Sequence, residues 1–265
     1  MAQKGFEYEE NAYKALEKYN ISTGGTAGAS HDKPDLTIQN KKTKKTAGCE
    51  LKISPTAAGS LVMKYVNGKW IYGDYKGEEE KEFLHSIGEE FHLLREMNVS
   101  GNAGKKWRDK VPSLQNTDKG KKIIIGNIDK REAYKIDISQ FGGENEIKID
   151  IPAKEICNYY ITKKCSYINV GTHGFYTLNG KDVLDINKKL KELKQKEIPD
   201  FAKNAKATLR VRCQYKGSGD YQFVMTLEFK NVNKSEYNIA PLKKGSSSTI
   251  DVVGLQNDPL LLCFG

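Results

Sequence analysis

The sequence predicts an α/β protein, and three observations lead to this fold class. Residues 5–19 have the spacing of an amphipathic helix, because apolar positions recur there every three or four residues. Residues 35–39 and 47–54 are typical of short strands, and a lysine-rich turn joins them. Beyond about residue 150, short segments rich in aromatic and β-branched residues indicate a region dominated by strands. We therefore expect a core domain within residues 1–150 and a β-rich region within residues 151–265, either separate from the core or continuous with it.

The other elements follow from local patterns along the chain. Asn67-Gly68 is the strongest short turn signal and predicts a hairpin. The remaining predicted elements are a glycine-rich loop at 22–34, the hairpin at 61–75, a helix at 78–97, a polar loop at 98–120, a buried strand at 121–128 and a lysine-rich helix at 185–196.

Composition limits the function classes. Lysine and arginine number 43 against 34 acidic residues, and the resulting charge of +9 favours a polyanionic partner such as nucleic acid. The chain has no apolar run long enough for a membrane helix, and its N-terminus lacks the features of a signal peptide. The five cysteines are odd in number and widely spaced, which favours reduced thiols over disulfides. We expect a cytoplasmic protein that does not contact a membrane.

One constellation of charged residues indicates chemistry. Asp35 opens the first short strand, and Glu50-Leu51-Lys52 lies in the second. Carboxylates held close together on neighbouring strands repel each other unless a cation lies between them, and hard oxygen ligands favour magnesium. Lys52 shares a strand face with Glu50, where its ammonium group can orient a water molecule or stabilise charge on a phosphorus centre. The set therefore predicts a metal-dependent reaction on a phosphate-containing substrate.

The pattern Pro34-Asp35 followed by Glu50-Leu51-Lys52 resembles the PD-(D/E)XK motif of the restriction-endonuclease-like nuclease superfamily. This resemblance implies a mixed sheet flanked by helices and phosphodiester hydrolysis with Mg²⁺, for which Mn²⁺ substitutes. It makes Asp35 and Glu50 metal ligands, with the Leu51 carbonyl as a further ligand, and assigns Lys52 to the attacking water or the developing charge. The family often adds an acid from a preceding helix; Glu9 on the apolar stripe of residues 5–19 is the first choice, and the neighbouring Glu10 remains open.

Contacts to DNA are expected from two further places. Ser30 and His31 lie in the glycine-rich loop before Asp35, where a hydroxyl or imidazole can donate to a phosphate. Arg210 and Arg212 alternate with Val211 and share one strand face, from which they can reach phosphates or guanine edges.

Together these patterns predict a magnesium-dependent DNA endonuclease, encoded by a bacterium or a phage, that cuts double-stranded DNA at specific sites. Cutting both strands with one site per chain requires a homodimer. Two alternatives stay open. The same catalytic set serves a Holliday-junction resolvase or repair nuclease, and the charge alone also fits a nucleic-acid-binding protein without catalysis. The number of metal ions is not set by the sequence.

Overall fold

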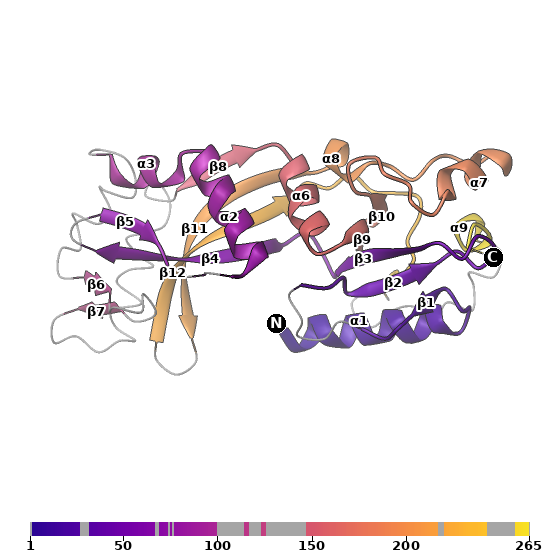
Figure 1. Cartoon of the computed structure of the whole chain (residues 1–265), viewed down its shortest axis with the longest axis horizontal. Coiled ribbons are helices and arrows are strands. Elements are labelled where there is room, and N and C mark those ends of the chain that lie inside the picture. Colours follow the sequence, from indigo (N-terminus) through magenta and orange to yellow (C-terminus); the bar gives the residue numbers. More distant parts are fainter. Residues whose placement is uncertain are drawn as a thin grey trace. The chain divides into compact units, whose positions relative to one another are not determined.

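The computed structural model describes residues 2–26, 32–66, 69–73, 75, 77–99, 114–116, 123–125, 147–216, 220–242 and 258–264. Helices and strands alternate irregularly along these residues (Figure 1). In chain order the elements are α1 (Ala2–Glu17), β1 (Ser22–Thr23), β2 (Leu36–Gln39), β3 (Thr46–Lys52), β4 (Ala57–Val66), β5 (Lys69–Tyr72), α2 (Glu79–Glu90), α3 (Leu93–Asn98), β6 (Leu114–Asn116), β7 (Ile123–Ile125), β8 (Lys148–Ile151), α6 (Lys154–Thr162), β9 (Cys165–Val170), β10 (Gly174–Thr177), α7 (Ile186–Glu192), α8 (Phe201–Asn204), β11 (Lys206–Lys216), β12 (Asp220–Lys230) and α9 (Pro259–Leu262).

The chain forms two compact units that alternate along the sequence. The first unit combines three segments, Met1–Thr56, Pro152–Lys206 and Phe229–Gly265, and the second combines Ala57–Ile151 with Ala207–Glu228. The chain crosses between the units after Thr56, Ile151, Lys206 and Glu228. Each unit contains a five-stranded sheet, which confirms the α/β class.

A mixed sheet of strand order β1-β2-β3-β9-β10 forms the centre of the first unit. β2 pairs antiparallel with β1 and β3, whereas β3 pairs parallel with β9, whose partner β10 is antiparallel. A parallel pair requires a crossover connection. Here the connection between β3 and β9 contains most of the second unit followed by helix α6.

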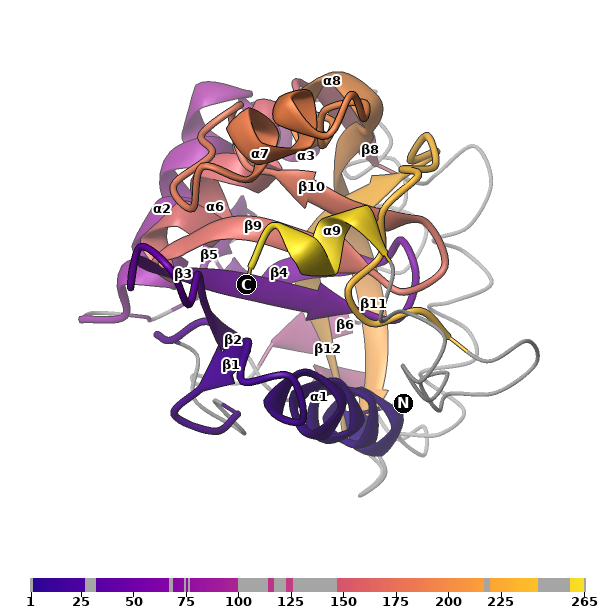
Figure 2. The same cartoon turned by 90° about the vertical axis from the view of Figure 1, so that its right-hand side faces the viewer.

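Helices lie on both sides of this sheet. α1 lies along one side, and α6 and α7 lie on the other, as Figure 2 shows from a second direction. The apolar stripe of α1 is buried against the sheet, with Tyr8, Ala12 and Leu16 at most 1% exposed. These residues pack with Leu36 and Leu51 in one hydrophobic cluster, so burial of the stripe fixes the position of α1 against β2 and β3.

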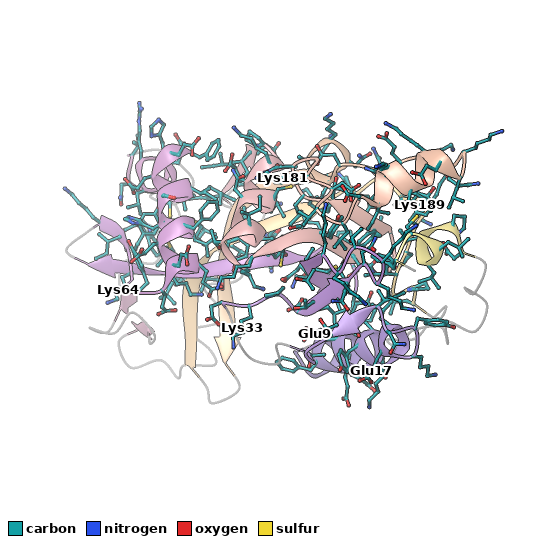
Figure 3. All side chains as sticks on the ribbon, turned by 45° about the vertical axis from the view of Figure 1, so that its right-hand side comes forward. Glu9, Glu17, Lys33, Lys64, Lys181 and Lys189 are labelled. Carbon is teal, nitrogen blue, oxygen red and sulfur yellow. The ribbon has the colours of Figure 1, made fainter. Side chains whose placement is uncertain are left out.

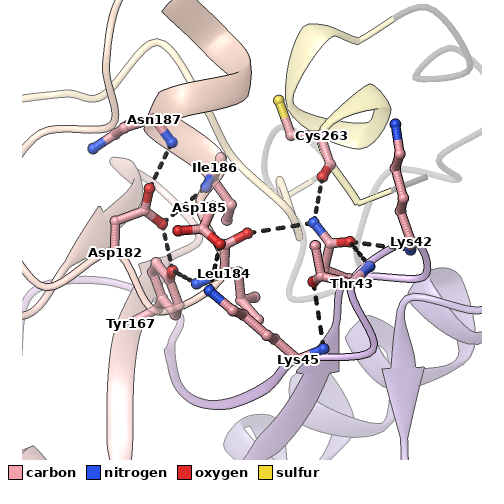
Figure 4. Close-up of polar contacts among 11 residues, drawn as sticks. Lys42, Thr43, Lys45, Tyr167, Asp182, Leu184, Asp185, Ile186, Asn187 and Cys263 are labelled. Atoms are coloured by element: carbon pink, nitrogen blue, oxygen red, sulfur yellow. Dashed lines mark hydrogen bonds and ion pairs between the residues drawn. The ribbon is translucent and has the colours of Figure 1, made fainter.

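Two polar side chains, the buried Asn40 and the partly buried Asp182, connect segments of the first unit (Figure 4). Asn40, in the turn after β2, donates to the carbonyl oxygens of Leu184 and Cys263 and accepts from the backbone N–H groups of Lys42 and Thr43. Because a buried amide must satisfy its hydrogen bonds, Asn40 holds the β2–β3 turn against the C-terminal segment.

Asp182 organises the start of α7. Its carboxylate accepts from the backbone N–H groups of Ile186 (3.0 Å) and Asn187 (2.7 Å) and from the Tyr167 hydroxyl (2.7 Å). That hydroxyl in turn accepts from the backbone N–H of Leu184.

We expect Asp182→Ala to lower the free energy of unfolding by about 2–4 kcal/mol, because three donors lose a charged acceptor. Urea denaturation measures this change. Glu192→Ala, which removes only an exposed ion pair with Lys189, is the matched control and should change stability by at most about 0.5 kcal/mol. Equal effects of the two substitutions would contradict the assignment.

The second unit contains the sheet β5-β4-β12-β11-β8, in which β4 pairs antiparallel with β5 and β12, and β11 with β8. α2 packs against it through Gly88, where a Cβ atom would meet the Tyr72 hydroxyl at 2.1 Å and Met225 Sδ at 3.2 Å. Trp70 and Phe223 stack edge to face in its core, with ring centroids 5.3 Å apart.

Several predicted elements need correction. The helix predicted over 78–97 is two helices, because His92 adopts a left-handed backbone (φ 56°) between α2 and α3. The strands predicted after residue 150 divide between the two sheets, and the sequence pattern did not reveal α6. Within the described part of the chain, no helix is long and apolar enough to cross a membrane.

Candidate active site

The face of β3 that meets α6 carries a buried ion-pair network. Glu50 is completely buried, and its Oε1 atom lies 2.5 Å from the Lys52 ammonium nitrogen. Its Oε2 atom lies 2.8 Å from the Nζ atom of Lys163. Burial alone would raise the pKa of Glu50, but the two ammonium groups outweigh it and hold the pKa below its ordinary value. Glu50 is therefore ionised at neutral pH.

Asp35 lies immediately before β2, next to this network. Its side chain is 6% exposed, and Oδ2 accepts from the backbone N–H of Leu51 at 2.8 Å. Burial, and then the charge of Glu50, raise the pKa of Asp35 to about 6. Gly48 of β3 allows the residues before β2 and β9 to approach closely. A Cβ atom at Gly48 would meet Pro34 Cβ, before β2, at 2.8 Å and the Lys164 carbonyl oxygen, before β9, at 2.4 Å.

The Leu51 carbonyl lies on the same side of β3 as Asp35. The Lys52 carbonyl accepts from the backbone N–H of Gly171 at 2.7 Å and so points toward the β9 side. Carbonyls of successive strand residues point in opposite directions, and the Leu51 N–H already reaches Asp35. Leu51 therefore directs its carbonyl oxygen toward the edge where Asp35 lies.

Glu9 faces this cluster from α1, whereas Glu10 faces solvent. Figure 3 shows Glu9 on the side of α1 toward the sheet and Glu17 on the opposite side. Burial, followed by the charge of Asp35, raises the pKa of Glu9 to about 7, with Lys52 acting in the other direction. Glu10 instead pairs with Lys14 at 2.7 Å on the exposed surface. Of the two glutamates that the sequence left open, the structure brings Glu9 to the other acids.

The neighbouring Tyr8 fixes the rotation of α1. Its hydroxyl donates to the Ala240 carbonyl at 2.8 Å and accepts from the side-chain amide of Asn169 at 3.1 Å. Since Tyr8 is 1% exposed, this anchored side chain determines the direction in which Glu9 leaves the helix.

Sequence reasoning missed two members of the site, both contributed by α6. Lys163 follows the last turn of α6 and is 8% exposed, and Tyr160, one turn earlier, is completely buried. The ammonium nitrogens of Lys52 and Lys163 lie 5.6 and 5.7 Å from the centroid of the Tyr160 ring. The signal was the segment 152–164, PAKEICNYYITKK, in which a proline precedes apolar residues at helical spacing and two lysines follow. We call Glu9, Asp35, Glu50, Lys52 and Lys163 the acid–lysine cluster.

The donor set of the cluster fits a hard divalent ion. Magnesium is commonly held by one or two carboxylates and keeps several water molecules. Asp35 and Glu50 provide two carboxylates whose mutual repulsion an ion would relieve, and Leu51 provides a carbonyl oxygen on the same edge. Across the described residues, no three His, Cys, Asp or Glu side chains form a group that could hold a metal ion, so Glu9 does not complete a three-carboxylate cage. Asp35, Glu50 and the Leu51 carbonyl would hold the ion.

The other predicted contact residues lie elsewhere. Ser30 and His31 fall outside the described residues. Arg210 and Arg212 are on β11, and both form ion pairs with Glu228 on β12. Guanidinium nitrogens of Arg212 and Arg210 lie 2.8 Å and 3.9 Å from Glu228 Oε1. Both arginines belong to the second unit, whereas all members of the acid–lysine cluster belong to the first.

The raised pKa of Glu9 predicts a pH-dependent stability. A carboxyl group whose pKa is higher in the folded than in the unfolded state favours folding at low pH, and this contribution is lost as pH rises from about 4.5 to about 7. In EDTA, wild-type protein should therefore lose Tm relative to Glu9→Gln between pH 5 and pH 8, by roughly 2–4 °C. Differential scanning calorimetry measures this difference, and Glu10→Gln is the control. A difference between wild type and Glu9→Gln that does not change with pH would contradict the placement of Glu9.

Comparison of the chain with protein-family models, with curated proteins and with solved structures found no match.

Proposed function

We propose that the protein is a magnesium-dependent endonuclease that hydrolyses phosphodiester bonds in double-stranded DNA. The observation that carries this proposal is the convergence of Asp35 and Glu50, from adjacent strands, with the Lys52 ammonium 2.5 Å from one Glu50 oxygen. A buried carboxylate whose pKa is raised by burial and by a second carboxylate, beside a lysine, is a candidate functional group. The mixed sheet with helices on both sides also agrees with a restriction-endonuclease-like core.

Each residue has a defined task in this reaction. Asp35, Glu50 and the Leu51 carbonyl hold the divalent ion, which supplies Lewis-acid activation of water and of the phosphate. Burial alone would lower the pKa of Lys52, but Glu50 and Asp35 raise it above its ordinary range. Lys52 therefore stays protonated and stabilises negative charge on the phosphate oxygens in the transition state; it does not accept a proton.

Glu9 is suited to receive the proton of the attacking water. Its pKa of about 7 matches a general base at neutral pH. As the water oxygen bonds to phosphorus, the bond between phosphorus and the leaving oxygen breaks, and the leaving oxygen takes a proton from solvent.

The substrate proposal rests on charge and symmetry. The net charge of +9 favours a polyanion, and double-strand cleavage with one site per chain requires a homodimer. Arg210 and Arg212, on one strand face, are candidates for reading DNA, and Ser30 and His31 are candidates for contacting its backbone.

Plasmid digestion tests the proposal. Wild-type protein with Mg²⁺ should convert supercoiled plasmid to nicked and linear forms, and EDTA should prevent this. Lys52→Met should reduce the rate by about 10²–10³-fold, because one charge-stabilising donor is lost. Lys203→Met, which removes an exposed lysine of α8, should cleave at the wild-type rate.

Comparing linear duplex, four-way junction and single-stranded substrates distinguishes a restriction-type enzyme from a junction resolvase or repair nuclease. Fixed ends on linear duplex favour the restriction type. Binding of DNA without cleavage of any substrate would refute the nuclease and favour a binding protein.

A further inference from the structure

Lys163 is the feature of the site that the proposed reaction leaves unexplained. A single lysine, Lys52, already serves the developing charge, yet a second ammonium group lies 2.8 Å from the other oxygen of Glu50. Burying an ammonium group is costly unless it is paired, so Lys163 depends on its ion pair with Glu50. Lys163 also comes from a different element, 113 residues away from Glu50 in sequence.

Tyr160 gives the two lysines a fixed support. Its ring lies below both ammonium groups, at 5.6 Å from Lys52 and 5.7 Å from Lys163. A cation near an aromatic face is favoured, particularly where water is excluded. The Tyr160 hydroxyl is buried without a hydrogen-bond partner in the described structure, so its ring carries an unsatisfied polar atom in the interior.

Charge balance limits how many metal ions the cluster accepts. When all members are ionised, its three carboxylates and two ammonium groups leave one net negative charge. One divalent ion reverses this to one positive charge, which one phosphodiester anion neutralises. A second divalent ion would leave an uncompensated excess of positive charge in a buried site, which is unfavourable.

We propose that Lys163 takes the place of a second divalent cation, so that the site binds one metal ion per chain. In this arrangement Lys163 is a positioning residue: it holds Glu50 Oε2, the oxygen that a second ion would otherwise bind. The single ion would lie at Asp35 and the Leu51 carbonyl, together with Glu50 Oε1, which pairs with Lys52 in the structure without an ion. The inference rests on the proposed nuclease function. It concerns the number of metal ions bound per chain, which is measured without DNA cleavage.

Titration of the full-length chain with MnCl₂ alone, by isothermal titration calorimetry at pH 8, tests the proposal. Wild-type protein should bind one Mn²⁺ per chain. Lys163→Gln keeps a hydrogen-bond donor to Glu50 but removes the charge, and it should bind two. Lys164→Gln makes the same change at the adjacent exposed lysine and should bind one, as wild type does.

The metal dependence of cleavage provides a second readout. The Hill coefficient for Mg²⁺ in plasmid nicking should be near one for wild type and Lys164→Gln, and near two for Lys163→Gln. The Mg²⁺ concentration for half-maximal rate should rise at least about tenfold in Lys163→Gln.

Each outcome decides between the two proposals. Two Mn²⁺ ions per wild-type chain would overturn the role of Lys163 while leaving the nuclease intact, and this measurement decides even if Lys163→Gln does not fold. A folded Lys163→Gln that still binds one ion would also overturn it. One ion per wild-type chain with no cleavage of any DNA would refute the nuclease instead.

Discussion

Asp35→Asn should abolish magnesium-dependent cleavage and at the same time stabilise the folded protein. Under the proposed function, loss of a carboxylate that would hold the metal ion should reduce the nicking rate by at least about 10³-fold. Asparagine keeps an oxygen that can accept from the Leu51 N–H group, so the local hydrogen bond survives. The substitution removes a charge that is costly to bury and that Glu50 also repels, and these two effects are the source of the stabilisation.

The sign and size of the stability change follow from the pKa. The Asp35 pKa is about 6 in the folded state against an ordinary value of 3.8, so ionised Asp35 opposes folding at pH 8. Asp35→Asn should therefore raise the free energy of unfolding in EDTA at pH 8 by about 1–3 kcal/mol. This gain should shrink as pH falls from 6 toward 4, because protonation removes the same charge in the wild type.

Urea denaturation at pH 8 and pH 5, together with plasmid nicking, measures both effects. Asp185→Asn changes an exposed carboxylate that pairs with Lys45 and is the control, with cleavage unchanged and no stabilisation. Cleavage by Asp35→Asn at the wild-type rate, or a lower stability than wild type at pH 8, would be incompatible with a repelled metal-ligating pair.

Glu50→Gln should also abolish cleavage but should destabilise the protein by about 3–5 kcal/mol, the reported cost of breaking a buried ion pair. Glu50 is completely buried, and its charge compensates two ammonium groups. The substitution leaves Lys52 and Lys163 close together without a counter-charge from β3. Substitutions of the two acids should thus have opposite effects on stability, because burial and Glu50 disfavour the Asp35 charge, whereas two ammonium groups stabilise the Glu50 charge.

A double substitution gives the control for this prediction. Glu50→Gln combined with Lys163→Met removes one of the two stranded charges and should recover part of the lost stability, so the two changes should be non-additive. Urea denaturation of the single and double variants measures the coupling. Additive losses would mean that Lys163 and Glu50 do not stabilise each other.

Local patterns were sufficient to predict part of the site. Asp35 immediately precedes one short strand, and Glu50 and Lys52 belong to the next; the alternation and turn of these strands can be read from residues 31–54. The stripe of α1 selects Glu9 as an inward acid. The structure brings these four side chains together through the predicted helix and strands. Whether they act as catalytic residues stays a prediction for the cleavage experiments.

What the sequence did not reveal depends on contacts between distant segments. Lys163 reaches Glu50 only because β9 pairs parallel with β3, and no local sequence pattern encodes that pairing. The division of the chain into alternating units was equally hidden, since a strand such as β11 has the same pattern in either sheet. α6 was missed because aromatic and β-branched residues, which favour strands, fill much of it.

The parallel pairing of β3 with β9 also affects the order of events during synthesis. The strand that carries Glu50 and Lys52 leaves the ribosome early, but its neighbour β9 and the partner Lys163 follow more than a hundred residues later. Contacts of such long separation form slowly, and N-terminal segments emerge first during translation. A nascent or prematurely terminated chain therefore carries Asp35 and Glu50 without an assembled acid–lysine cluster.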